Sequence, residues 1–192
     1  MKLFTTLLLA TTLVGSGITD TKTDFTEPNE QTEERTETPE VTYKLIGSGF
    51  NYNETEALEF FQNHGITDKM ALAVILGNIK QESKFLPNIC EGGARVPYSS
   101  CYRGGYGLIQ WTTSGRYWGL GNYASKSGGD ASSLRTQLEY LVTEREWKSA
   151  CSKFRTPDKS MNYYMNGAYT WLGWGIEGSR GYYSQDYYNR LS

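Results

Sequence analysis

The chain has 192 residues, which is enough for one domain of ordinary size with short appended segments. Its formal net charge is −2, and from Leu45 onward 13 acidic residues stand against 15 basic ones, so the main part of the chain is only mildly basic. No basic block is dense enough to indicate a nucleic-acid partner, and we therefore exclude that class of function.

The first residues have the layout of a secretory signal peptide, which we place at residues 1–19. Lys2 supplies the basic start, an apolar core of 12 residues runs from Leu3 to Val14, and small residues follow it. Because this apolar run is short for a membrane span, we predict a secreted, extracellular protein with no stable membrane association. The competing interpretation is an uncleaved membrane anchor.

The segment after the signal peptide is rich in Thr, Glu and Pro. Between Asp20 and Lys44 it carries 8 acidic residues and 3 basic ones. Such a composition buries too little apolar surface to offset the entropy cost of ordering the chain. We therefore predict a disordered linker over residues 20–49 and a single folded domain over residues 50–192, which we expect to be a monomer.

Helical signals dominate the predicted domain. Asn53 is a candidate N-cap for a first helix that ends at Gly65, and Thr67 opens a second, strongly apolar helix that runs to Lys84. Further helices are predicted over residues 115–124, after Asp130, and over residues 159–171 and 179–191. No segment alternates convincingly, so the fold class is mainly α, with a long glycine-rich loop and at most a small β-hairpin between residues 90 and 109.

Three cysteines follow the predicted export signal, and a disulfide is therefore plausible chemistry. Cys90 and Cys101 are the candidate pair because they bracket a loop rich in Gly, Pro and Ser. Cys151 is then left over, although its pairing with either of the others stays open. With one histidine, His64, and no C-x-x-C motif, the sequence predicts no metal site and no cofactor.

Glu82 is the first candidate catalytic residue. It lies near the end of the most apolar predicted helix, where Ala73, Leu76 and Ile79 lead to it at a spacing of three residues. A carboxyl group held against apolar walls has its charged form disfavoured, and this raises its pKa toward the range that a general acid needs. A solvated residue of the last helical turn is the competing interpretation.

The stretch GGYGLIQW, residues 104–111, supplies the candidate binding residues. Tyr106 and Trp111 flank its glycines, and aromatic faces pack on sugar rings, while the amide of Gln110 can bond a sugar hydroxyl or brace the loop itself. Tyr163 or its neighbour Tyr164 is a further candidate for the cleft, on a predicted helix.

Two motifs in this region together resemble a known family. The pattern GN-x-x-x-ES-x-F-x-P over residues 77–87, followed by GYGLIQWT and Arg116, resembles the phage tail lysozyme family, within the lysozyme-like superfamily. The likeness extends over roughly residues 50–192 and includes the late segment YTWLGWGIEGSRGYY. It implies a lysozyme-like helical domain that cleaves the glycan of bacterial peptidoglycan, with Glu82 in the position of the catalytic glutamate, and it leaves virion association possible.

The resemblance implies cleavage of the β-1,4 bond between N-acetylmuramic acid and N-acetylglucosamine. A two-carboxylate mechanism requires a second acid, for which Glu91 and Glu177 are the candidates. Some relatives use one glutamate, so hydrolysis and lytic transglycosylation both stay open. Two further functions compete with a glycosidase, namely a Cys–His wall peptidase using His64 and a module that binds wall glycan without cutting it.

Overall fold

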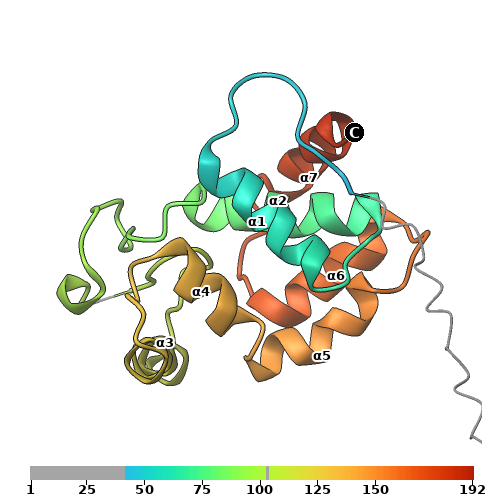
Figure 1. Cartoon of the computed structure of the whole chain (residues 1–192). Helices are drawn as coiled ribbons and strands as arrows, with labels where there is room; N and C mark the ends of the chain where they lie inside the picture. The colour runs from blue at the N-terminus through green and yellow to red at the C-terminus, as the bar shows by residue number, and fades with distance from the viewer. Residues whose placement is uncertain (1–41, 103) are drawn as a thin grey trace, which may run out of the picture. The chain divides into compact units, whose positions relative to one another are not determined.

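The computed structural model describes residues 42–102 and 104–192, and within them it is mainly helical (Figure 1). The described part contains seven α-helices and one short 3-10 helix, but no β-ladder longer than an isolated bridge. The helices are α1 (Tyr52–Asn63), α2 (Lys69–Ser83), η1 (Tyr98–Ser100), α3 (Ser114–Ser127), α4 (Leu134–Leu141), α5 (Arg145–Phe154), α6 (Met161–Leu172) and α7 (Arg180–Arg190). The predicted fold class is confirmed.

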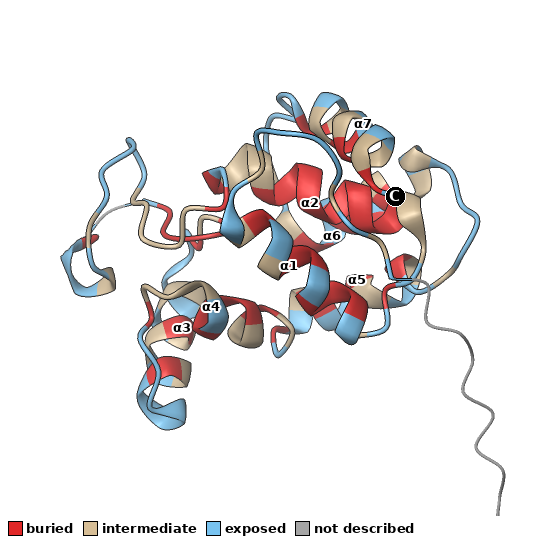
Figure 2. Ribbon diagram, turned by 45° about the horizontal axis from the view of Figure 1, so that its top comes forward, coloured by how far each residue is buried: buried red, intermediate tan, exposed pale blue. Residues whose placement is uncertain are grey.

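Helix α2 forms the centre of the core. Asp68 caps it by accepting a hydrogen bond from the backbone N–H of Ala71 at 2.9 Å, and every residue from Ala71 to Ile79 is buried (Figure 2). Each fully buried aliphatic side chain of this kind contributes about 1.5–3 kcal/mol to stability. The apolar character of α2 thus reflects contact with neighbours on all of its faces, among which α7 makes the most extensive contact.

The close packing of α2 on α7 depends on Gly77. A Cβ atom at this position would lie 2.5 Å from the backbone nitrogen of Ser184 and 2.8 Å from its Cα. Both atoms belong to the backbone of α7, so the contact is relieved only by moving the helix.

We therefore expect Gly77→Ala to destabilise the domain by about 2 kcal/mol, because overpacking outweighs the better helix propensity of alanine. Urea denaturation measures this loss. Gly115→Ala is the matched control, since a Cβ there meets nothing within 4 Å. Equal stability of wild type and Gly77→Ala would contradict the close approach.

A buried carboxylate ties α1, α2 and α7 together. Glu54 accepts hydrogen bonds from the backbone N–H of Asn51 and from Lys80 Nζ, each at 2.7 Å, and from the Tyr187 hydroxyl. Burial and the bond to Glu54 raise the pKa of Tyr187, which keeps the phenol protonated as the donor. Since its lone pairs are occupied by these partners, Glu54 has a structural role.

Several element boundaries differ from the sequence prediction. Asn51, and not Asn53, caps α1, because Glu54 completes a capping box with it. Helix α5 was not predicted separately. The folded part also begins before residue 50, since the N–H of Lys44 bonds to the carbonyl of Ser192 at 2.8 Å and Leu45 forms a bridge with Leu191. The predicted linker is thus too long at its C-terminal end.

The predicted signal peptide and most of the predicted linker lie outside the described residues. Among the residues that are described, no helix has the length and apolar character needed to cross a membrane.

Candidate active site

Glu82 lies in the last turn of α2, immediately before a strained reversal of the chain. Lys84 and Phe85 both have positive φ values, 53° and 60°, which are unfavourable for residues with a Cβ. The reversal is held because Phe85 is fully buried and its carbonyl accepts a hydrogen bond from Asn53 Nδ2 at 2.8 Å. Helix α2 therefore ends abruptly, and the side chain of Glu82 faces a cleft.

The cleft has a volume of about 430 Å³ and is lined by Glu82 and by residues from two further stretches of the chain, 109–116 and 172–180. Glu82 comes from α2, Arg116 from α3, and Arg180 from the start of α7. The loop between α6 and α7 contributes Trp174, and the segment before α3 contributes Gln110, Thr112 and Thr113. Among the described residues that line this cleft, Glu82 is the single carboxylate.

Arg180 is the closest charged partner of Glu82. Its Nη2 donates to Glu82 Oε1, while its Nη1 donates to the carbonyls of Ile176 at 3.0 Å and Glu177 at 2.8 Å. The guanidinium also lies over the ring of Trp174, 4.6 Å from the ring centre. With only 4% of its surface exposed, Arg180 is fixed in place, and it fixes Glu82 in turn.

Two opposing effects set the pKa of Glu82. Burial disfavours the carboxylate and raises the pKa, whereas the charge and hydrogen bond of Arg180, and the more distant charge of Arg116, lower it. Burial is the larger effect, so the pKa of Glu82 lies above its ordinary value. The side chain is 15% exposed, which leaves it accessible from the cleft. A raised pKa and access from the cleft are two properties that a general acid requires.

Arg116 is held by a second buried carboxylate. Glu144 accepts two parallel hydrogen bonds from Arg116, each at 2.7 Å, and a third from Trp111 Nε1 at 3.0 Å. Bidentate pairs of this kind fix the plane of the guanidinium. Glu144 is 5% exposed and does not line the cleft, so it holds Arg116 and Trp111 in position from the protein interior.

The glycine-rich loop is braced by three polar side chains. Gln137, fully buried, accepts from the N–H of Leu108 at 2.9 Å and donates to two further backbone carbonyls. Gly107 has a φ of +74°, and a Cβ there would lie 2.5 Å from Gln137 Oε1. Glu91 accepts from the N–H of Gly105 at 3.0 Å, and Gln110 Nε2 donates to the Gly107 carbonyl at 3.0 Å.

A disulfide closes the same loop. Cys90 and Cys101 are bonded with an S–S distance of 2.01 Å, which confirms the predicted pair, and Cys151 is free.

The structure corrects the binding role predicted for two aromatic residues. Tyr106 and Trp111 are both fully buried. The Tyr106 hydroxyl donates to the carbonyl of Val96 at 3.1 Å, and Trp111 donates to Glu144. Neither ring presents a face to a ligand, because each packs inward as part of the core. Gln110 does line the cleft, and its amide also braces the loop, which is the second of the two roles predicted for it.

The remaining predicted site residues lie outside the Glu82 cleft. Glu91 braces the glycine-rich loop. Glu177 is exposed and lines a neighbouring hollow of about 240 Å³ with Tyr169 and Trp174. Tyr163 is half-buried on α6, edge-on to Tyr164. The structure therefore does not bring a second predicted carboxylate to Glu82.

Sequence reasoning missed four residues that build the site, namely Arg180, Trp174, Glu144 and Gln137. The signal for Arg180 was weak, because a single arginine after GIEG has no distinctive spacing. Glu144 and Gln137 accept hydrogen bonds from loop residues that lie 33 and 29 positions earlier in the chain. Among the described residues, no group of three or more His, Cys, Asp and Glu side chains has the arrangement of a metal site.

Comparison with known proteins gives one family match. The sequence model described as phage tail lysozyme matches residues 52–189. Among the curated proteins, no sequence matches the chain. The match starts at the first residue of α1 and ends in the last turn of α7, so it includes every element that lines the Glu82 cleft.

Proposed function

Because the chain belongs to the phage tail lysozyme family, we propose that it cleaves the β-1,4 bond between N-acetylmuramic acid and N-acetylglucosamine, with Glu82 as the general acid. The family indicates a lysozyme-like function directed at peptidoglycan. The observation that supports the finer proposal is a carboxyl group with a raised pKa at the floor of a cleft. No other carboxylate lines that cleft among the described residues.

In the proposed reaction, protonated Glu82 donates its proton to the oxygen of the glycosidic bond as that bond breaks. The sugar that loses this oxygen develops positive charge at its anomeric carbon. Arg180 acts as a positioning residue, because it holds the carboxyl group in one orientation while its own guanidinium is fixed by two carbonyls and by Trp174.

A cleft with one carboxylate favours a mechanism that needs no second acid. Two-carboxylate enzymes place the second group roughly 5 Å from the first if they retain configuration, and roughly 6.5–9.5 Å away if they invert it. Neither Glu91 nor Glu177 lines the cleft. The anomeric carbon is then attacked by the acetamido oxygen of the substrate, and water opens the resulting oxazolinium ion and gives a proton back to the Glu82 carboxylate. Alternatively, the 6-hydroxyl of the same sugar attacks, its proton passes to the Glu82 carboxylate, and an anhydro sugar forms. The second route is lytic transglycosylation, which the same observation supports.

Digestion of purified peptidoglycan by the full chain tests the proposal. Release of glycan fragments with new reducing ends indicates hydrolysis, and release of fragments with anhydro-muramyl ends indicates transglycosylation. Either product supports a glycosidic cut by this site. If neither type of end forms, the chain does not act as a glycosidase on this polymer.

The pH dependence of the rate gives a test of Arg180. Its positive charge favours the carboxylate and so holds down the pKa of Glu82, although burial keeps that pKa above its ordinary value. When the charge is removed in Arg180→Gln, the pKa rises further and the acid stays protonated to higher pH. We therefore expect the alkaline limb of the kcat/KM profile to move to higher pH.

Arg180→Lys keeps the charge, and we expect it to shift the alkaline limb less. Arg145→Gln serves as the exposed control, because the Arg145 side chain is 90% exposed and pairs with Glu146. An alkaline limb that stays in place or moves to lower pH in Arg180→Gln would show that Arg180 does not set the protonation of the acid.

The location of the protein enters the proposal only through its family. The family suggests association with a virion or with the extracellular space, where peptidoglycan is reached. Secretion through residues 1–19 and a monomeric state stay predictions. Size-exclusion chromatography of the exported chain would measure its oligomeric state.

A further inference from the structure

Arg116 is a cationic side chain of the Glu82 cleft with hydrogen-bond donors still unused. It donates through Nε and Nη2 to Glu144, and among the described residues no acceptor bonds its Nη1. Arg180, in contrast, is already bonded to Glu82 and to two carbonyls, and 4% of its surface is exposed. The Arg116 side chain is 18% exposed and lines the cleft, so its remaining donors are available to a ligand there.

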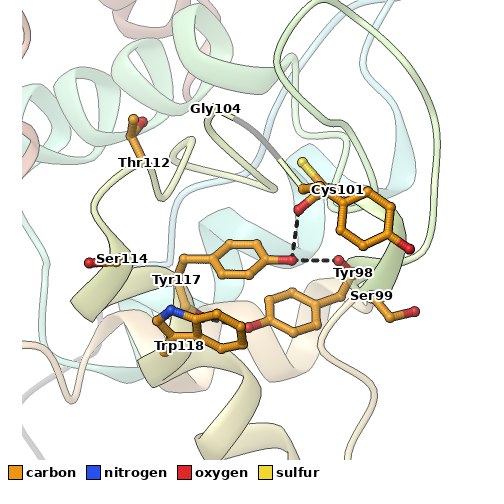
Figure 3. Close-up of a pocket in the computed structure, with 9 residues that line it drawn as sticks. Tyr98, Ser99, Cys101, Gly104, Thr112, Ser114, Tyr117 and Trp118 are labelled. Carbon is orange, nitrogen blue, oxygen red and sulfur yellow. Dashed lines mark hydrogen bonds between the residues drawn. The ribbon is translucent and has the colours of Figure 1, made fainter.

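The neighbours of Arg116 hold it in one position. Glu144 fixes the plane of the guanidinium through two parallel bonds of 2.7 Å. The Tyr140 hydroxyl donates to the carbonyl of Arg116 at 3.0 Å. The hydroxyl of the next residue, Tyr117, lies 3.0 Å from the carbonyl of Cys101, and this contact joins the start of α3 to the disulfide-closed loop (Figure 3). The guanidinium is therefore in position before a ligand arrives, and little further ordering is needed on binding.

The charges around the cleft favour an anionic group on the ligand. When Glu82 is protonated, as the proposed general acid is, the positive charges of Arg116 and Arg180 are opposed by the negative charge of Glu144 alone. One positive charge is then in excess, because the described lining of the cleft holds no acidic side chain besides Glu82. In a partly buried cleft this charge is screened less than on an open surface, so it attracts and orients an anion.

The glycan of peptidoglycan offers an anion close to the bond that is cut. N-acetylglucosamine is neutral, whereas N-acetylmuramic acid carries a lactyl ether on its ring. While a stem peptide is attached, the lactyl carbonyl is part of a neutral amide. Once that amide has been hydrolysed, the lactyl group ends in a free carboxylate. The carboxylates of a stem peptide itself lie further from the sugar ring.

We propose that Arg116 binds the lactyl carboxylate of N-acetylmuramic acid and so gives the cleft a preference for glycan strands without stem peptides. The proposal rests on the proposed function, and it adds the chemical state of the preferred substrate. A carboxylate pairs with a guanidinium through short, charge-assisted hydrogen bonds, which Nη1 of Arg116 can donate. The oxygen of an amide in the same place accepts a weaker bond, because it carries no full charge. Arg116 therefore determines specificity by direct contact with the substrate.

This preference places the cut after another reaction. A free lactyl carboxylate arises when the amide between the lactyl group and the first residue of the stem peptide is hydrolysed. Water supplies the hydroxyl of the new carboxyl group and the proton of the released amine, so the step needs no other reactant. Amide hydrolysis of this class therefore supplies the substrate that the cleft prefers.

Binding to the full-length Glu82→Gln protein tests the preference without turnover, and its neutral amide stands in for the protonated acid. One probe is a peptide-free oligosaccharide of alternating N-acetylglucosamine and N-acetylmuramic acid, and the other is the same oligosaccharide with its lactyl carboxylates converted to primary amides. We expect the carboxylate form to bind about tenfold more tightly, as one charge-assisted hydrogen bond contributes. Titration calorimetry at low salt measures both affinities. A preference of less than about twofold overturns the proposal.

Variants of the ion pair assign the preference to Arg116. Because the loss of Arg116 alone leaves Glu144 buried without its partner, Arg116→Gln is combined with Glu144→Gln in the same background. We expect the two probes to bind this double variant with equal affinity. Glu144→Gln alone keeps the guanidinium, and Arg145→Gln alters an exposed side chain, so both should keep the preference. A general structural loss weakens both probes and leaves their ratio unchanged, and a ratio that survives in the folded double variant overturns the role of Arg116.

Kinetics of the otherwise unmodified chain connect the preference to cleavage. Soluble strands whose stem peptides have been removed are expected to show a KM about tenfold lower than strands that retain them. An equal or lower KM for the strands with stem peptides overturns the proposal, because it assigns no advantage to the free lactyl carboxylate. If the carboxylate probe is preferred through Arg116 but peptidoglycan is not cut, the contact stands and the proposed glycosidase activity fails.

Discussion

Replacing Glu82 by glutamine is expected to lower the rate of peptidoglycan cleavage by about a thousandfold, within the range that a positioned general acid contributes. Glutamine keeps the shape of the side chain, and its amide oxygen still accepts a hydrogen bond from Arg180. It carries no transferable proton at the point where the leaving oxygen requires one. The initial rate of clearance of purified peptidoglycan measures this loss.

The same variant is expected to fold and to bind glycan as the wild type does. Because burial raises the pKa of Glu82, the fold disfavours the charged form relative to water, and we expect a neutral amide to leave the melting temperature unchanged or slightly higher. Glu177→Gln is the matched control, since Glu177 is exposed and lies outside the cleft. It should keep its rate within about threefold. Equal rates for Glu82→Gln and wild type would rule out Glu82 as the acid.

Replacing Glu144 by alanine is expected to destabilise the domain by about 3 kcal/mol, because the change leaves a largely buried arginine and an indole N–H without their partner. Glu144 accepts both parallel bonds from Arg116 and the bond from Trp111 Nε1. Activity should fall as well, since Arg116 lines the cleft with Glu82. Chemical denaturation measures the stability, and clearance of peptidoglycan measures the activity.

Glu146→Ala provides the control for this loss. Glu146 lies two residues further along and pairs with the exposed Arg145 at 3.5 Å, and such surface pairs contribute less than about 1 kcal/mol. Glu144→Gln, which keeps an acceptor for Trp111, should fall between the two. Similar stabilities for Glu144→Ala and Glu146→Ala would show that the buried network does not support the site.

The central helix and its carboxyl group could be predicted from the sequence for a physical reason. A helix that is apolar on all sides must lie in the core, and the continuous run of buried residues from Ala71 to Ile79 follows from that. The position of Glu82 at the end of this helix could be predicted because it continues the three-residue spacing of Leu76 and Ile79. The reversal at Lys84 and Phe85, which ends the helix just after Glu82, was not predicted, because no pattern of turn residues indicates it.

The aromatic residues of the loop show where sequence reasoning was insufficient. Glycines around Tyr106 and Trp111 predicted an exposed loop with rings available to a ligand. The loop instead turns both rings inward, because partners at Val96 and Glu144 satisfy their polar atoms. The exposed rings beside the cleft are Tyr102 and Trp118, on segments that carried no motif.

Charged partners of the site were hardest to predict, because they come from distant parts of the chain. Arg180 reaches Glu82 across 98 residues, and Glu144 reaches Arg116 across 28. Local periodicity places residues on one face of a helix but says little about which helix ends meet. The disulfide between Cys90 and Cys101 was predictable because both cysteines lie in one short loop.

Mass analysis of the soluble fragments released from purified peptidoglycan, by the wild-type chain and by Glu82→Gln in parallel, is the decisive test of Glu82 as the acid of a glycosidase. We expect the wild type to release muropeptides cut between N-acetylmuramic acid and N-acetylglucosamine, and Glu82→Gln to release almost none. Fragments with intact glycan and cleaved peptides, or the same glycan fragments from both proteins at equal rates, would contradict this assignment.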